Sequence, residues 1–117
     1  MSNEVGFTKG PFGFQIHYEN GWTASVQWGW GNYCRNRSMV NNDYNPDFLS
    51  SPNAEIAAFP TDKHYSQNYW YHFPDESDVV KGWVNVQEVM EFLNLVSNFA
   101  EFNPEAYIFE ECETTNA

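Results

Sequence analysis

The feature that most constrains the fold is an alternation of apolar and polar side chains between Phe12 and Trp28. A repeat of two residues is the period of a β-strand, because successive side chains of a strand point to opposite faces. The alternation is interrupted once, by Glu19-Asn20-Gly21, whose residue types favour a turn. The segment therefore predicts a β-hairpin.

The length of the turn decides which side chains of the hairpin share a face. A two-residue loop of Asn20 and Gly21 would set the apolar residues of one strand beside the polar residues of the other. A three-residue loop with Gly21 in the left-handed region keeps the apolar residues together. We predict this second register, with the pairs Tyr18–Trp22, Ile16–Ala24 and Phe14–Val26. The opposite face then shows a polar set to water or to a partner: Gln15, His17, Thr23, Ser25 and Gln27.

Shorter patterns predict the other strands. Residues 29–52 are rich in Gly, Asn, Ser and Pro, which predicts a long irregular connection. Three further strands are predicted at 54–59, 69–73 and 79–84, and the acids around Asp75 predict a solvated turn before the last of them. The sheet should therefore contain about five strands.

Apolar residues recur at helical spacing from Val86 to Phe102, which predicts a helix over this range. Asn85 is predicted to cap its N-terminus, and Glu88 at the third helical position completes a capping box. Pro104 disfavours continuation, and residues 104–112 fit either a helix or a strand. We therefore predict an α+β fold: an antiparallel sheet of about five strands with one main C-terminal helix packed on a face.

The length of 117 residues fits one domain over 1–117, with a core of about 12–102 and a frayed end at 113–117. The N-terminal residues lack the features of a signal peptide, and no apolar run is long enough to span a membrane. Cys34 and Cys112 are expected to be free thiols. These observations predict a cytoplasmic protein that does not bind a membrane.

Charge and aromatic content together exclude several classes of protein. The chain carries 16 acidic and 5 basic residues, a formal net charge of −11, and 22 aromatic side chains. Disordered acidic tails are poor in aromatic residues, and proteins that contact nucleic acid directly need a basic surface. What remains is an acidic globular protein without direct nucleic-acid contact.

The acidic residues are concentrated in the C-terminal third. Ten of them lie between Asp75 and Ala117, where Lys81 is the single base. Carboxylates fixed on a firm scaffold can imitate the phosphates of DNA and attract a basic partner rapidly. We hypothesise an acidic partner-binding surface made by Glu88, Glu91, Glu101, Glu105, Glu110 and Glu111. The alternative is a solvated helix face and tail whose charge keeps the protein soluble.

Residues suited to catalysis or metal binding do not form a recognisable motif. The histidines fall on different predicted elements, without a His or Cys partner at ligand spacing: His17, His64 and His72. Cys34 lies near Arg35 and Arg37, which could lower its pKa, but no nucleophile elbow or papain-like segment surrounds it. We therefore expect no metal, no cofactor and no enzymatic activity.

An alternative ligand site is centred on Trp28-Gly29-Trp30-Gly31-Asn32-Tyr33. Glycines beside aromatic residues can cradle a phosphate or present a stacking platform, and nearby arginines supply positive charge. This site comprises Trp28, Trp30, Tyr33, Arg35 and Arg37. The other interpretation is that the glycines bend the end of a strand while the tryptophans pack on the core.

Several stretches resemble small uncharacterised proteins encoded by bacteriophages: 19–29, 31–34, 51–59, Gly82-Trp83-Val84 and Glu88-Val89. The similarity covers roughly Phe12 to Phe99, and none of the stretches is a known functional motif. The resemblance implies expression in a bacterial host and a role against host defence, as in anti-CRISPR or anti-restriction inhibitors. It assigns no site residues.

Three functional hypotheses follow from these observations. The first is a binding protein that inhibits a basic, nucleic-acid-handling or defence protein of the host through its acidic surface, in the manner of a DNA mimic. The second is a small-ligand binder, such as a nucleotide sponge, that uses the Trp/Arg loop. The third is a virion assembly protein. The sequence leaves the oligomeric state open, because exposed and buried aromatic residues look alike in it.

Overall fold

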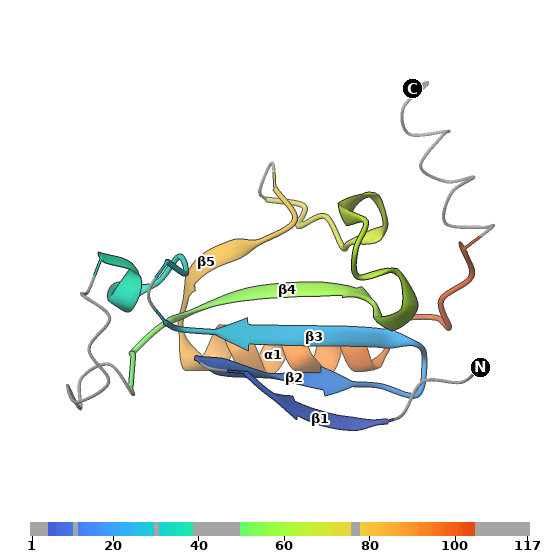
Figure 1. The fold of residues 1–117 in the computed structure, drawn as a ribbon, viewed down its shortest axis with the longest axis horizontal. Coiled ribbons are helices and arrows are strands. Elements are labelled where there is room, and N and C mark those ends of the chain that lie inside the picture. Colours follow the sequence, from blue (N-terminus) through green and yellow to red (C-terminus); the bar gives the residue numbers. More distant parts are fainter. Residues whose placement is uncertain (1–4, 11, 30, 39–49, 76–77, 105–117) are drawn as a thin grey trace.

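Within the described residues, five strands in one antiparallel sheet and one α-helix form the regular framework (Figure 1). The structure is a computed structural model that describes residues 5–104 except 11, 30, 39–49 and 76–77. The strands lie in chain order across the sheet: β1 (Gly6–Lys9), β2 (Gly13–His17), β3 (Trp22–Gln27), β4 (Ala54–Pro60) and β5 (Lys81–Val84). The helix α1 (Val86–Ser97) packs on one face. The predicted α+β fold is confirmed.

The β2–β3 hairpin has the predicted register. Phe14 lies opposite Val26 and Ile16 opposite Ala24. The Tyr18 N–H donates to the Trp22 carbonyl at 2.9 Å, and Gly21 has a φ of 86°, in the left-handed region that favours glycine. The pattern of apolar residues therefore sets the pairing of these strands.

The start of α1 is confirmed and its predicted end is wrong. Asn85 and Glu88 form the capping box, with the Glu88 N–H donating to the Asn85 side chain at 2.8 Å. The helix ends at Ser97 instead of Phe102, because Asn98 becomes its C-cap and the Asn20 amide binds the carbonyls of Val96 and Phe99. These bonds satisfy carbonyls that a longer helix would have used internally.

Two strand predictions need correction. Residues 69–73 do not form a strand: 67–69 is a short 3-10 helix, and Tyr71 N–H makes one bond to the Ala58 carbonyl. The edge of β4 is instead paired with β5, which begins at Lys81, two residues later than predicted. Strand β1 was not predicted from the sequence, since four residues carry too short an alternation to identify.

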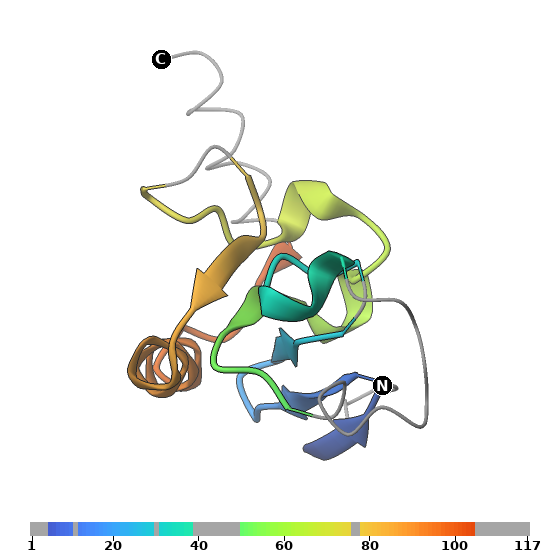
Figure 2. The same ribbon diagram turned by 90° about the vertical axis from the view of Figure 1, so that its left-hand side faces the viewer.

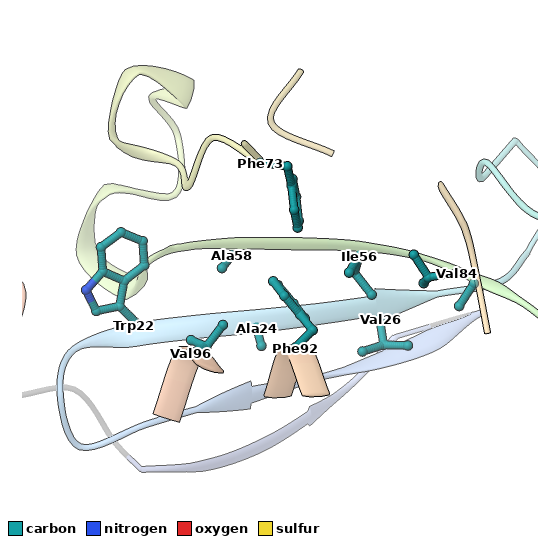
Figure 3. Packing of buried hydrophobic residues seen from close by; sticks show 10 residues of the cluster. Trp22, Ala24, Val26, Ile56, Ala58, Phe73, Val84, Phe92 and Val96 are labelled. Carbon is teal, nitrogen blue, oxygen red and sulfur yellow. The ribbon is translucent and has the colours of Figure 1, made fainter. Parts of the chain in front are cut away.

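The core lies between α1 and the sheet (Figure 3). Apolar residues of β3 and β4 face the helix, and Phe92 and Val96 of α1 face the sheet. Phe73 follows the 3-10 turn and closes the cluster, with its ring centroid 5.5 Å from that of Phe92. The alternating residues of the hairpin thus supply one wall of the core, and α1 supplies the other.

The opposite face of the hairpin is more buried than the sequence predicts. Thr23 is fully buried and Ser25 nearly so, whereas both were expected to face water or a partner. Gln15, His17 and Gln27 are half-buried. A chain of hydrogen bonds explains how the polar groups are accommodated: Thr8 Oγ1 to His17 Nε2 at 2.7 Å, His17 Nδ1 to Thr23 Oγ1 at 2.8 Å, and Thr23 Oγ1 to Thr61 Oγ1 at 2.6 Å.

Candidate functional site

A groove of about 370 Å³ lies between β5 and α1. Figure 2 shows α1 end-on, with β5 running toward it from the edge of the sheet. The groove has an apolar floor and a charged rim, and its lining comprises Ile56, Tyr71, Phe73, Pro74, Asp75, Lys81, Val84, Glu88, Glu91, Phe92 and Leu95. We refer to it as the acidic groove.

Among the residues that the structure describes, three carboxylates and one lysine line the acidic groove. Glu88 and Glu91 come from the first half of α1, where a spacing of three residues places them on neighbouring positions of one helix face. The Glu88 carboxylate accepts the Asn85 N–H at 3.0 Å, and the Glu91 carboxylate accepts the Gln87 side-chain amide at 3.2 Å. These bonds orient the two carboxylates beside the apolar floor.

Asp75 and Lys81 form an ion pair at the rim, with a distance of 2.7 Å between Nζ and the carboxylate oxygen. The hydrogen bond from Lys81 is the main cause that lowers the pKa of Asp75, and a backbone hydrogen bond adds to it. Because the folded pKa is lowered, the ion pair persists at neutral pH and is lost only as the pH falls through that lowered value.

Replacing Lys81 with Gln is expected to raise the pKa of Asp75 toward its ordinary value, because the dominant hydrogen bond to the carboxylate disappears. Asp75 then begins to protonate at a higher pH on acidification. An NMR titration of its carboxyl carbon measures the change. Lys63→Gln removes the same charge from a lysine that lies over the Tyr65 and Tyr69 rings, and should leave Asp75 unchanged. An unaltered Asp75 titration in Lys81→Gln would contradict the assignment.

The structure brings together two of the six glutamates predicted as the partner-binding surface. Glu88 and Glu91 both line the acidic groove, whereas Glu101 is exposed beyond the end of α1 and is not part of its lining. Glu105, Glu110 and Glu111 lie outside the described residues. Asp75, which the sequence placed in a solvated turn, joins the groove through the return of the chain into β5, and no local pattern could have indicated this.

The residues of the alternative ligand site are divided between the two faces of the sheet. Trp28 packs against the core on the helix face, 6.3 Å from the Phe14 ring. Tyr33 lies on the other face, where its N–H donates to the Glu55 carboxylate and the Arg37 guanidinium stacks 4.2 Å from its ring centroid.

The two arginines of that site also hold the loop together. Arg35 donates to the Ser50 carbonyl at 2.6 Å and to the Asn36 side chain at 3.0 Å, and Arg37 donates to the Gly31 carbonyl at 2.9 Å. Trp30 lies outside the described residues. The small-ligand hypothesis therefore stays a prediction, and within this site Arg37 stacks directly on Tyr33.

A second, mostly apolar cavity of about 270 Å³ flanks the other side of α1. Its walls include Val26, Trp28, Val84, Val86 and Met90, and the side chains of Val86 and Met90 are exposed. Polar groups reach it from Ser50, Ser51, Asn53 and Asn85. None of the described residues that line it is acidic, so the described walls of the two cavities beside α1 differ in the ligands that they favour.

Cys34 is fully buried, and its thiol donates a weak hydrogen bond to the Gly29 carbonyl at 3.8 Å. Burial is the largest cause that raises the pKa of this thiol, and it outweighs the lowering effect of Arg35. Arg35 therefore lowers the pKa of the thiol, as the sequence suggested, but the net shift is upward because burial dominates. A buried thiol with a raised pKa is a poor nucleophile.

Within the described part of the chain, no group of three His, Cys, Asp or Glu side chains is arranged to hold a metal ion. None of the helices found there is both long enough and apolar enough to cross a membrane. Comparisons of the chain with protein-family models, with curated proteins and with solved structures give no significant match. The site must therefore be interpreted from its own chemistry.

Proposed function

We propose that this chain is a non-enzymatic binding protein that inhibits a basic, nucleic-acid-handling protein of its host. The observation that carries the proposal is the acidic groove, in which Asp75, Glu88 and Glu91 surround an apolar floor. The partner presents a segment that carries arginine or lysine together with apolar residues. The virion assembly hypothesis stays a prediction.

The groove matches such a segment in two ways. Carboxylates form strong charge-assisted hydrogen bonds with guanidinium and ammonium groups. The apolar part of the lining, which includes the buried Phe92 and the exposed Leu95, can cover the aliphatic stems of the same side chains. A groove that offers both kinds of contact favours a basic protein segment over a free cation, which would use the carboxylates alone.

The net charge of −11 supports the inhibitory part of the proposal. A strongly negative protein encounters a basic surface rapidly. Nucleic acid is also negative and binds the same kind of surface, so this protein and nucleic acid compete for the partner. The resemblance to phage-encoded proteins points to a partner in a bacterial cell. Screening reduces long-range attraction between exposed charges, so complex formation should weaken as the salt concentration rises.

Charge reversal in the groove tests the proposal. A pull-down from bacterial lysate at low salt should recover a specific basic partner with the wild-type chain, and added DNA should displace it. Glu91→Lys should reduce recovery about tenfold or more, because one lost or reversed ion pair of about 1.4 kcal/mol corresponds to a tenfold change in affinity. Binding of the purified partner by calorimetry gives the affinity ratio.

Glu19→Lys is the matched control, because Glu19 is an exposed acid in the β2–β3 turn and its reversal changes the net charge equally. It should retain most of the binding. The proposal fails if the wild type recovers no specific partner, if DNA does not compete, or if Glu19→Lys weakens binding as much as Glu91→Lys.

A further inference from the structure

The apolar cavity of about 270 Å³ beside α1 reaches from the core to the surface. Val26 and Val84, which Figure 3 shows at one end of the core, supply buried walls of this cavity. Val86 and Met90 also line it, and they are 70% and 59% exposed. Apolar side chains that stand open to water around a cavity gain burial when a ligand fills it.

The absence of charge in the described walls restricts the class of ligand. None of the described residues that line the cavity carries a charge. A charged group set against such walls would lose its hydration without gaining an ionic partner. The net charge of −11 also repels anions. The cavity therefore favours a neutral ligand.

Two asparagines in the lining have their side-chain oxygens occupied. The Asn53 Oδ1 accepts the Arg35 N–H at 2.7 Å, and the Asn85 Oδ1 accepts the Glu88 N–H at 2.8 Å. Because the oxygen of each amide must face an N–H, these bonds fix the orientation of both amides. No hydrogen bond among the described residues uses either Nδ2 group. Each asparagine therefore keeps its amide donors for a ligand.

The serines of the lining add to the same imbalance. The Ser50 carbonyl accepts from Arg35 at 2.6 Å and from Asn36 at 3.0 Å. The Ser51 hydroxyl donates to the Asn53 carbonyl at 2.6 Å and accepts the Asn53 N–H at 3.3 Å. The Ser50 hydroxyl can donate as well as accept. The described polar groups of the cavity thus offer more donors than acceptors, and a matching ligand presents an acceptor oxygen.

We propose that this cavity binds a neutral molecule of two fused rings that carries a carbonyl oxygen. An apolar cavity of about 150 Å³ holds one benzene ring, so a cavity of about 270 Å³ holds roughly two rings. The rings contact the apolar walls, and the carbonyl accepts from Asn53 or Asn85. Among the described residues, Val84 alone lines both this cavity and the acidic groove, so the inference does not rest on the basic partner proposed above.

Coumarin and indole are suitable probes, because both are neutral and have two fused rings. Coumarin carries a carbonyl acceptor, whereas indole carries a donor. In NMR titrations coumarin should bind the wild-type chain with a dissociation constant below about 1 mM. The amide signals of Val86 and Met90 and the indole N–H signal of Trp28 should shift. Coumarin-3-carboxylate, which adds a negative charge, should bind about tenfold more weakly or worse.

Asn53→Asp and Asn85→Asp test the donors. Aspartate keeps the side-chain oxygen that accepts the Arg35 or Glu88 N–H, so the local fold is retained, but it has no amide donor at neutral pH. At least one of the two variants should weaken coumarin about 3- to 10-fold, the loss expected for one hydrogen bond. Neither variant should weaken indole.

Met90→Ala tests the position of the ligand, because it removes an exposed wall of the cavity. It should weaken both probes about threefold or more. Phe7→Ala is the matched control, since Phe7 is a large apolar residue that is 81% exposed and does not line the cavity. It should bind both probes as the wild type does.

Each outcome bears on the inference alone and leaves the acidic groove to its own test. Failure of coumarin to bind, or shifts confined to residues outside the cavity lining, would overturn the site. Equal loss in Met90→Ala and Phe7→Ala would do the same. If neither aspartate variant changes the coumarin affinity, or if both probes weaken by the same factor, the carbonyl assignment is wrong.

Discussion

Replacing Phe92 with alanine is expected to lower the free energy of unfolding by about 3 to 5 kcal/mol. Phe92 is 5% exposed and reaches from α1 into the core, where its ring lies 5.5 Å from that of Phe73 (Figure 3). Alanine loses the transfer free energy of the ring and leaves a cavity between the helix and the sheet. Denaturant unfolding followed by circular dichroism measures the change.

Met90→Ala is the matched control, because it truncates a large side chain of the same helix at a position that is 59% exposed. Met90→Ala should lower the free energy of unfolding by less than about 1 kcal/mol. Phe92→Leu keeps most of the side-chain volume, so its free energy of unfolding should fall by only about 1 kcal/mol. It provides a measurable variant if the Phe92→Ala protein does not fold. Equal losses in Met90→Ala and Phe92→Ala would show that α1 does not pack on the sheet through Phe92.

Replacing Asn20 with aspartate is expected to lower the free energy of unfolding by about 2 to 4 kcal/mol. The Asn20 amide donates to the Val96 carbonyl at 2.9 Å and to the Phe99 carbonyl at 3.1 Å. Aspartate supplies no donor at neutral pH and sets a negative charge beside carbonyls at the negative end of the helix. The hairpin turn and the end of α1 would then repel each other instead of being joined.

Asn20→Ala removes the same donors without adding a charge, so it should lose less stability than Asn20→Asp. Asn68→Asp adds the same charge at an exposed position of the short 3-10 helix 67–69 and should change stability by less than about 0.5 kcal/mol. The deficit of Asn20→Asp relative to the wild type should shrink as acid protonates the new carboxyl, because its folded pKa is raised. A deficit independent of pH would exclude the electrostatic contribution.

The parts of the fold that were predicted from the sequence are those determined by near neighbours. The hairpin register follows from apolar residues that meet across one turn, as Phe14 and Val26 do. The capping box joins Asn85 and Glu88, three residues apart. Each depends on a short stretch of chain, where spacing alone determines geometry.

The errors arise where distant segments meet. Thr23 was expected to face water, but Thr61 and His17 surround its hydroxyl in the folded chain. The helix was expected to continue to Phe102, but Asn20, more than seventy residues earlier, binds the carbonyls of Val96 and Phe99 on either side of its end. Neither relationship leaves a periodic pattern in the sequence.

In the candidate site too, the residues related by local spacing were predicted, and those brought together by distant parts of the chain were not. Helical spacing predicts that Glu88 and Glu91 lie on neighbouring positions, and the structure places both in the groove. Asp75 reaches the groove through the return of the chain into β5.

The order of the strands has a consequence for how the chain folds. Strands β1, β2 and β3 are joined by short turns, so their pairing closes small loops at a small entropic cost. The side-chain hydrogen bonds from the hairpin to α1 join residues 75 and 76 positions apart. Loops of that size close late and slow the folding of a domain. Until α1 docks, the apolar face of the nascent sheet stays in contact with water, and this is the stage at which the chain is most vulnerable to aggregation.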